Sequence, residues 1–256
     1  MLPCVTNSTS PVLEFSNVVR SYPGEPRVVA VNDVSFQLPR GAFAAVLGPS
    51  GSGKTTLLNL ASGLDQAESG KIIIAGQSMS DLSQTALCDF RRRHLGFVFQ
   101  AYNLFPVLTA VENVEFTSLI RGDNAEEARS RAVEALTTVG LGHKLNATPG
   151  KLSGGQQQRV AVARALASKP DIIFADEPTA NLDSKTAMSL IELFEQLNAD
   201  FGVTFFFSTH DQKLADRVKT RIEMCDGVIA SPQAAAETKR AVPGLSGHDS
   251  SSNAFR

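Results

Sequence analysis

One short segment constrains the fold of this chain more than any other: a glycine-rich loop that matches the pattern G-x-x-x-x-G-K-[ST] at every fixed position. It lies between the apolar run Ala42–Leu47 and the helical run Thr55–Ala61, which is the strand-loop-helix context that such a loop needs. Its glycines allow backbone N–H groups to surround an anion, and the helix N-terminus adds the positive end of a dipole. The residues of the loop are Gly48, Pro49, Ser50, Gly51, Ser52, Gly53, Lys54, Thr55 and Thr56.

This loop predicts phosphate binding, with Lys54 at the β- and γ-phosphates of a nucleotide and the Thr55 hydroxyl at Mg²⁺. The alternative is an ordinary glycine-rich turn, but chance matches usually lack the strand and the helix. The loop does not identify a reaction, because kinases, GTPases and motor ATPases all use one. A GTPase also carries an N-K-x-D element for guanine, and this sequence has none.

The apolar runs on either side of the loop predict an α/β fold. The runs Ala42–Leu47, Ile172–Ala175 and Val203–Ser208 are almost wholly apolar, which is typical of parallel strands buried on both faces beneath helices. Further strands are expected at Val28–Val31, Ile72–Ala75 and Gly96–Phe99.

Two regions have helical periodicity. The stretch Leu104–Leu141 is expected to be helical, with Asn124 and Glu127 at capping-box spacing. A second amphipathic helix is expected after Asp183, with one apolar face formed by Ala187, Leu190, Ile191, Phe194 and Leu197. Residues 1–11 are expected to be a loose N-terminus, and residues 231–256 lack periodicity and are expected to be a disordered tail.

Charge and cysteine content exclude several classes of protein. The formal net charge is -2, from 24 basic and 26 acidic residues, so a strongly basic nucleic-acid binder is excluded. No apolar run approaches the roughly 18 residues that span a bilayer. The sequence therefore predicts a cytoplasmic chain without a membrane span. Cys4, Cys88 and Cys225 lie far apart, which favours reduced thiols in or near the core over a zinc site or a disulfide framework; too few residues precede Cys4 for a lipid-attachment leader.

A second glycine-rich helix start lies in Leu152-Ser153-Gly154-Gly155-Gln156-Gln157-Gln158-Arg159. Ser153 and Gln156 have the S-x-x-Q spacing of a capping box, so a helix is expected to begin here. Gly154 and Gly155 leave its first turn bare, which makes it a second candidate anion site. The alternative is an ordinary capped helix.

Polar residues end several of the expected strands. The run Ile172–Ala175 is followed by Asp176, which suits Mg²⁺, and by Glu177, which is placed to polarise an attacking water. His210 and Gln100 follow two other strands of the expected sheet, at the edge where ligand sites of open α/β sheets collect. Alone, the two acids are explained as solvated groups at a strand end, and a lone histidine as a hydrogen-bonded bystander. Four polar residues beside one phosphate loop favour a catalytic site.

These motifs, taken in order, resemble those of the ATP-binding subunit of ABC transporters. They are the phosphate loop, a Q-loop glutamine at Gln100, the signature at Leu152–Arg159, Walker B ending in Asp176 and Glu177, a D-loop with Asp183, and a switch histidine at His210. The resemblance covers about residues 12–230. It implies a P-loop NTPase fold with a mostly parallel core sheet, an antiparallel β subdomain, and a helical subdomain at about 101–168 that carries the signature.

The resemblance also implies an activity and partners. The activity is ATP hydrolysis with Mg²⁺, in which Glu177, His210 and Gln100 act catalytically and Thr55, Gln100 and Asp176 hold the metal. The partners are a second copy and a membrane permease at the cytoplasmic face of the inner membrane. ATP on one phosphate loop would be covered by Ser153, Gly154, Gly155 and Gln156 of the other copy, and Asp183 would link the two sites. Tyr22 sits where the family stacks an aromatic ring on adenine, although a turn tyrosine before Pro23 explains that position too.

The subfamily and the partner surface follow from finer features. The D-loop Asn181 and the stretch Phe90–Val114 resemble ATPases of lipoprotein release and macrolide export. A non-transport regulator of cell division and an importer ATPase remain as alternatives. Residues Ala101–Asn113 are expected to help form a groove for a coupling helix of the permease, through Tyr102 and Phe105, unless Phe105 is simply a core residue. The run Arg91–Arg93 either contacts the partner or lipid headgroups or forms a solvated face.

Overall fold

The computed structural model describes residues 10–230 of the chain. The strands are β1 (Leu13–Tyr22), β2 (Val28–Leu38), β3 (Phe43–Leu47), β4 (Ser69–Ile74), β5 (Gln77–Ser78), β6 (Leu95–Val98), β7 (Ile172–Asp176), β8 (Thr204–Thr209), β9 (Thr220–Cys225) and β10 (Val228–Ile229). The α-helices are α1 (Lys54–Ala61), α2 (Gln84–His94), α3 (Ala110–Ile120), α4 (Ala125–Thr138), α5 (Gly154–Ala167), α6 (Ser184–Phe201) and α7 (Gln212–Ala215), and 3-10 turns occupy Met79–Asp81, Gly142–Lys144 and Pro149–Lys151.

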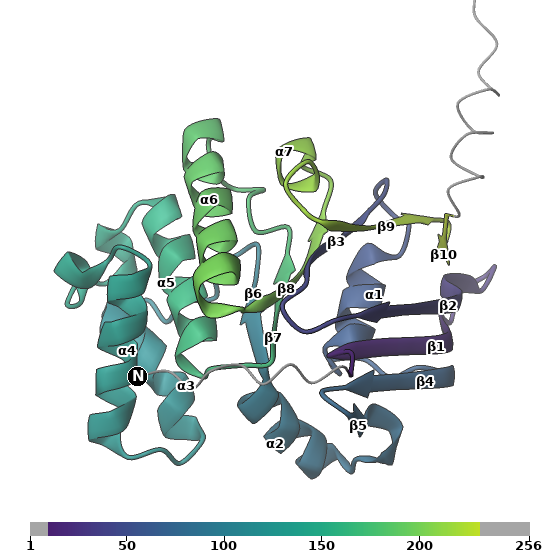
Figure 1. The fold of residues 1–256 in the computed structure, drawn as a ribbon, viewed down its shortest axis with the longest axis horizontal. Helices are drawn as coiled ribbons and strands as arrows, with labels where there is room; N and C mark the ends of the chain where they lie inside the picture. The colour runs from purple at the N-terminus through teal and green to yellow at the C-terminus, as the bar shows by residue number, and fades with distance from the viewer. Residues whose placement is uncertain (1–9, 231–256) are drawn as a thin grey trace, which may run out of the picture.

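The larger sheet has the strand order β10-β9-β3-β8-β7-β6 (Figure 1). Strand β3 pairs in parallel with β8 and β9, and β7 pairs in parallel with β8 and β6; only the short β10 runs antiparallel to its neighbour. The expected parallel core sheet is therefore confirmed. Because these strands are parallel, their carboxyl ends meet at one edge, where the phosphate loop, Asp176 and Thr209 all lie.

Successive residues of these strands enter two separate cores, as the alternation of side chains across a strand requires. One core contains the strand residues Phe43, Ala45, Ile173, Ala175, Phe205 and Phe207, together with apolar residues of α3, α4, α5 and α6. The other core contains Ala44, Val46, Ile172, Phe174 and Phe206, together with α1 and the smaller sheet. Helices α1 and α5 therefore pack on opposite faces of the larger sheet, on either side of β8 in Figure 1.

The smaller sheet is antiparallel, with the order β2-β1-β4-β5, and packs on α1 through side chains such as Leu13, Phe15, Leu38 and Ile74. Helices α3, α4 and α5 form a helical layer whose core includes Val111, Val114, Ala132, Leu136 and Val160. Both the antiparallel β subdomain and the helical part with the signature motif are thus present. The subdomain boundary at 101–168 remains a prediction.

Several expectations on local structure need correction. The stretch Leu104–Leu141 is not helical throughout, because residues 104–109 are irregular and α3 and α4 are separated at 121–124. Asn124 does cap α4, but its side chain accepts from the N–H of Glu126, so the expected partner Glu127 is not used.

The placement of the cysteines in the core is wrong for Cys88 and Cys225, which are both exposed. Cys4, most of the predicted loose N-terminus and the predicted tail 231–256 lie outside the described residues. Within the described range 10–230, no helix combines the length and apolar character needed to cross a membrane.

Candidate functional site

The phosphate loop runs from the end of β3 to the start of α1, and two of its glycines are required by close backbone approaches. A Cβ on Gly53 would lie 2.1 Å from the carbonyl oxygen of Ala30, and one on Gly48 would lie 2.1 Å from that of Met224. Gly53 is also the N-cap of α1, in a left-handed conformation with φ of 100°. Because Gly53 has no side chain to cap the helix, the first N–H groups of α1 face the loop without a side-chain acceptor.

The buried lysine of the loop is held by the loop itself. Lys54 is 8 % exposed, and its Nζ donates hydrogen bonds to the carbonyl oxygens of Gly48 (2.8 Å) and Pro49 (2.9 Å). The ammonium group has a third donor to spare. The Ser52 hydroxyl is buried too, and no described residue forms a hydrogen bond with it. A free helix N-terminus, a spare ammonium donor and an unpartnered hydroxyl at one loop fit a polyphosphate.

Both acids at the end of β7 are oriented by the neighbouring strand β8. The Ser208 hydroxyl donates to Asp176. The Glu177 N–H donates to the Ser208 carbonyl oxygen at 3.0 Å, and Glu177 has a φ of 44°, an uncommon value for a residue with a side chain. The sequence did not single out Ser208, although its position beside two carboxylates on the adjacent strand end was the available signal.

Glu177 and His210 form a pair. The Nδ1 atom of His210 lies 2.7 Å from Glu177 Oε1, and the second carboxylate oxygen accepts from the Thr209 hydroxyl at 3.3 Å and the His210 N–H at 3.4 Å. The Glu177 side chain is only 17 % exposed, whereas that of His210 is 70 % exposed. Sequence reasoning missed Thr179, whose hydroxyl donates to Asp211 at 3.0 Å and so joins the two strand-end loops.

The signature segment forms the N-terminus of α5 with the expected capping box. The Gln156 N–H donates to Ser153 Oγ at 3.3 Å, and the Ser153 N–H donates to Gln156 Oε1 at 3.0 Å. A Cβ on Gly155 would lie 2.2 Å from Thr186 Cγ2, so the glycine permits contact with the start of α6. The buried Gln158 side chain donates to the Pro178 carbonyl oxygen, which ties α5 to the loop after β7.

Asp183 of the D-loop is the N-cap of α6. Its carboxylate accepts from the N–H groups of Lys185 (3.0 Å) and Thr186 (3.1 Å) and from the Thr186 hydroxyl. The Thr186 hydroxyl, followed by the backbone N–H donors, holds the pKa of Asp183 below its ordinary value. The signature and the D-loop are therefore one connected unit, with Thr186 in contact with both.

Two other predicted site residues are more loosely placed. Gln100 follows β6 with an exposed side chain, and its carbonyl oxygen accepts from Asn181 of the D-loop at 3.0 Å. Tyr22 ends β1; its hydroxyl donates to Asp65 at 2.7 Å, and the Arg20 guanidinium lies 4.9 Å from the ring centroid. Tyr22 therefore contacts a carboxylate and a cation outside the turn at Pro23, so turn formation is not its sole interaction.

The structure brings some of the predicted residues together and separates others. Lys54, Asp176, Glu177 and His210 share the carboxyl edge of the parallel strands. The signature at Ser153 belongs instead to α5 on the opposite face from α1, as Figure 1 shows. Within one chain, the two glycine-rich helix starts thus occupy separate faces of the sheet.

A groove lies beside Gln100, between β6, α3 and α5. Its volume is about 370 Å³, and its apolar lining includes Phe97, Phe105 and Ile120. Phe105 is 43 % exposed, so the alternative that it is a core residue is wrong. Its loop is fixed by the fully buried Asn113, whose side chain accepts from the Phe105 N–H at 2.7 Å and donates to the carbonyl oxygens of Phe105, Leu108 and Thr109. Sequence reasoning placed Asn113 only at the end of the segment and missed this role.

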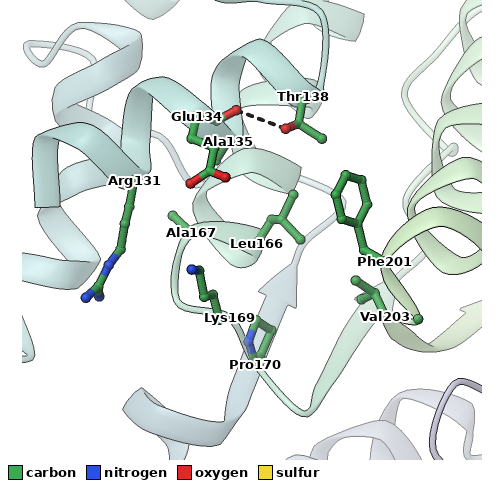
Figure 2. A pocket seen from close by; sticks show the side chains of 11 residues that line it. Arg131, Glu134, Ala135, Thr138, Leu166, Ala167, Lys169, Pro170, Phe201 and Val203 are labelled. Atoms are coloured by element: carbon green, nitrogen blue, oxygen red, sulfur yellow. Dashed lines mark hydrogen bonds between the residues drawn. The ribbon is translucent and has the colours of Figure 1, made fainter. Parts of the chain in front are cut away.

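A second cavity, of about 300 Å³, lies at the other edge of the sheet, where β7 and β8 begin (Figure 2). Leu166, Phe201 and Val203 contribute to its apolar surface, and Glu134 and Lys169 also line it. No predicted site residue lines it. The predicted site residues therefore lie elsewhere: at the carboxyl edge of the parallel strands, at the starts of α5 and α6 and, for Tyr22, at the end of β1.

Comparison with known proteins gives one consistent family. Residues 31–180 match the family model described as ABC transporter. The chain is 42 % identical over 224 residues to the lipoprotein-releasing system ATP-binding protein LolD of Alcanivorax borkumensis, with 87 % of this chain and 98 % of that protein covered. It is 46 % identical over 234 residues to the macrolide export ATP-binding/permease protein MacB of Hyphomonas neptunium, with 90 % of this chain but 36 % of that protein covered.

A solved structure supports the same relationship. The dimeric structure of a post-hydrolysis state of the ATP-binding cassette MJ0796, bound to ADP and Pi, is similar with a TM-score of 0.78 and 41 % sequence identity. The match covers 86 % of this chain and 97 % of that chain.

Proposed function

The chain belongs to the ABC transporter family of ATP-binding proteins, and we propose that two copies of it enclose ATP head to tail and drive a membrane permease. It is an ABC ATPase, the motor component of a transporter. One observation carries the proposed dimer: α1, which follows the phosphate loop, and α5, which begins at the signature, pack on opposite faces of the sheet, so we infer that neither completes a nucleotide site within its own chain. The dimeric cassette of similar fold supports this arrangement.

In the proposed site, the phosphate loop of one copy binds the ATP phosphates through Lys54 and the first N–H groups of α1. Ser153 to Gln156 of the other copy cover the γ-phosphate, and Tyr22 stacks on adenine. Mg²⁺ fits the oxygen donors Thr55, Asp176 and Gln100, because a hard cation prefers hydroxyl, carboxylate and amide oxygens. When bound, the metal neutralises charge on the phosphate oxygens.

Glu177 is the proposed base of the reaction. Its carboxylate is held against β8 by His210 and Thr209, which fixes its direction before substrate arrives. From there it polarises the water that attacks the γ-phosphate, and His210 maintains its position and contacts the phosphate. Asp183 transmits closure between the two sites, since it contacts Thr186 next to the signature.

The proposed partner is a permease of the lipoprotein-release or macrolide-export type. The relatives LolD and MacB support this type by their names, and the D-loop Asn181 agrees with it. The chain would then work at the cytoplasmic face of the inner membrane, attached through the permease. The groove beside Gln100 is the proposed docking site for a coupling helix of that permease.

The test of the catalytic proposal is Glu177→Gln, which keeps the shape of the side chain but removes its basicity. We expect hydrolysis to slow by at least about 10²-fold, because general bases contribute roughly 10²–10⁴-fold. Loss of a negative charge near the γ-phosphate also favours the ATP-bound dimer. Single-turnover hydrolysis and size-exclusion chromatography in Mg-ATP measure the two effects.

Glu134→Gln is the matched control, since it removes the same charge at the far cavity. It is expected to hydrolyse ATP at the wild-type rate and to accumulate no dimer. Near-normal turnover by Glu177→Gln would contradict the assignment and make His210 the first candidate for the catalytic role.

The coupling surface is tested by Phe105→Ala and Tyr102→Ala in the complex with the permease. Both should reduce permease-stimulated hydrolysis while ATP binding persists, because neither side chain touches the phosphate loop. Phe201→Ala, which removes another exposed aromatic ring from the far cavity, is the control. Phe105 lines the groove, whereas the Tyr102 side chain lies next to it and packs near Gly154. Intact stimulation in both variants would show that the permease docks elsewhere.

A further inference from the structure

The groove beside Gln100 combines an apolar floor with an unusual charge pattern. Three arginines line it, Arg91, Arg92 and Arg164, and its lining contains no acidic residue. The floor is aromatic, with Phe97 and Phe99 stacked at 5.8 Å between ring centroids. Cations around an apolar depression are complementary to an apolar ligand that carries negative charge.

Two of these arginines, Arg91 and Arg92, interact with residues of α2 and of neighbouring segments. Arg92 forms an ion pair with Asp89 and donates to the Ile120 carbonyl oxygen at 2.9 Å. Arg91 donates to the Gly63 carbonyl oxygen at 2.6 Å and to Cys88 Sγ at 3.1 Å. Arg92 therefore has a counter-charge within the chain, whereas Arg91 has no carboxylate partner among residues 10–230.

Arg164 differs from Arg92 in having no counter-charge, and from Arg91 in its position, because both of its hydrogen bonds go to the loop next to Gln100. It donates to the carbonyl oxygens of Tyr102, at 2.9 Å, and Asn103, and among residues 10–230 no carboxylate forms an ion pair with it. Burial lowers the pKa of its guanidinium below the ordinary value. A guanidinium has five N–H donors, of which these two bonds use two. A partly desolvated cation with spare donors and no counter-charge is a strong site for a carboxylate.

The surface around the groove indicates a protein segment as the ligand. Phe105 at 43 %, Val107 at 82 % and Ile120 at 50 % are exposed apolar side chains, and Phe105 and Ile120 also line the groove. Apolar surface that continues from a groove onto the open face of a protein marks an interaction site of larger extent than a small molecule. The apolar surface of the groove calls for apolar side chains in the bound segment, and the arginines call for a negative charge in it.

We infer that this groove binds an apolar segment of the membrane partner that carries one acidic side chain, and that Arg164 pairs with that carboxylate. The inference rests on the proposed function, in which the groove receives the permease. It adds what the groove recognises in the permease, namely one acidic side chain within an apolar segment. Because Arg164 also holds the Tyr102 and Asn103 carbonyl oxygens next to Gln100, the pair would fix the loop that adjoins the nucleotide site.

The experiment uses the full chain and a phage-displayed library of random peptides of about 15 residues, roughly four helical turns. We expect the wild-type chain to enrich apolar peptides with one Asp or Glu. A selected peptide and its acid-to-amide version are then synthesised. The amide version should bind at least about 10-fold more weakly, because hydrogen bonds to charged groups contribute roughly 1.5–3 kcal/mol.

Variants of the chain assign the effect to Arg164. Arg164→Gln retains N–H donors for the two carbonyl oxygens but removes the charge, so it should bind the acid and amide peptides equally. Arg164→Lys should restore part of the preference for the acid. Arg93→Gln is the control. Arg93 follows the groove residues Arg91 and Arg92 in the sequence, but it is exposed and does not line the groove. This variant should keep the full preference for the acidic peptide.

Three results would overturn the inference: no enrichment of acidic peptides by the wild type, an unchanged acid preference in Arg164→Gln, or Arg164-dependent binding only to vesicles of anionic phospholipid. Hydrolysis of ATP by the same wild-type preparation separates this inference from the proposed function. If the wild type hydrolyses ATP but does not enrich acidic peptides, the inference alone is overturned. If it does not hydrolyse ATP, the proposed function is overturned.

Discussion

The chain contains two glycine-rich helix starts, and they are built in different ways. At α1 the cap is Gly53, without a side chain, and the adjacent Lys54 bonds the loop carbonyl oxygens. At α5 the cap is Ser153, and Gln156 closes a capping box with it. Both present N–H groups and the positive end of a helix dipole, but the second already uses one of its orphan donors internally.

This difference supports the proposed division of work between the two sites. The start of α1 offers a lysine together with uncapped N–H groups, so it can hold a nucleotide on its own. The first turn of α5 contains no cationic residue. Its glycines allow close packing against Thr186 and Tyr102. It retains the Ser153 hydroxyl proton and the first two N–H groups as donors. Such a site contributes when a phosphate is delivered to it by another surface.

The largest effect is expected from Lys54→Ala, which removes the cation that distinguishes the start of α1 from the start of α5. In the proposed site it removes a charged hydrogen bond to the phosphates, which contributes roughly 1.5–3 kcal/mol, together with the two bonds that hold the loop, so nucleotide affinity should fall by at least about 10²-fold. Equilibrium binding of a fluorescent ATP analogue to the monomer measures this. Lys151→Ala, which removes an exposed lysine just before the signature, should bind nucleotide normally. Equal losses in both variants would mean that α5 contributes to binding in the monomer.

The next effect is expected at the weaker site. Gly155→Ala places a methyl group 2.2 Å from Thr186 Cγ2, so α5 or α6 must shift. Nucleotide binding by the monomer should persist, while hydrolysis should fall by about 10–10²-fold, because small misplacements at an assembled site have effects of that size. Thr186→Ser in the same chain removes the clashing methyl group, retains the hydroxyl for Asp183 and should restore hydrolysis.

The control for this substitution is Gly150→Ala, because a Cβ there meets no atom within 4 Å. Its hydrolysis should match the wild type. If Gly155→Ala instead reduced nucleotide binding by the monomer, the two helix starts would act within one chain and the proposed dimer would be contradicted.

The same two regions show what could be predicted from sequence. Both helix starts were located correctly, because phosphate loops and capping boxes have fixed local spacing. The apolar face of α6 and the parallel strands β3, β6, β7 and β8 were also found, since burial on one or both faces leaves a regular pattern. The parallel strand β9 was not predicted. The strand β1 was missed because shifts in its pairing between Phe15 and Ser21 break the alternation. Helix α2 was missed because Leu87 is its only buried residue.

Contacts between distant segments had no local signal. The capture of Asp176 by Ser208 joins residues 32 positions apart, and the Arg164 bond to Tyr102 joins residues 62 positions apart. The buried side chain of Asn113 looks like any polar residue in a helix, and only the folded chain shows that it organises residues 105–109. The exposure of Cys88 and Cys225 was misjudged because apolar character alone does not place a residue inside.

The smallest effect is expected from Asp183, the residue that couples the weaker site to α6. Its pKa is lowered by the Thr186 hydroxyl and then by backbone N–H donors, so its contribution to stability is present above the unfolded-state pKa of about 3.9 and is lost as the pH falls through the lower folded value. The thermal midpoint of the wild type should therefore decrease on acidification by slightly more than that of Asp183→Asn, with a difference on the order of 1 °C, because the carboxylate is exposed to solvent. Thr186→Val, which keeps the shape but removes the donor, should reproduce part of this change. Thermal scans of all three proteins between neutral pH and about pH 3 test the argument. Parallel curves for wild type and Asp183→Asn would show that α6 needs no charge at its N-cap, and that Thr186 is held against Gly155 by packing alone.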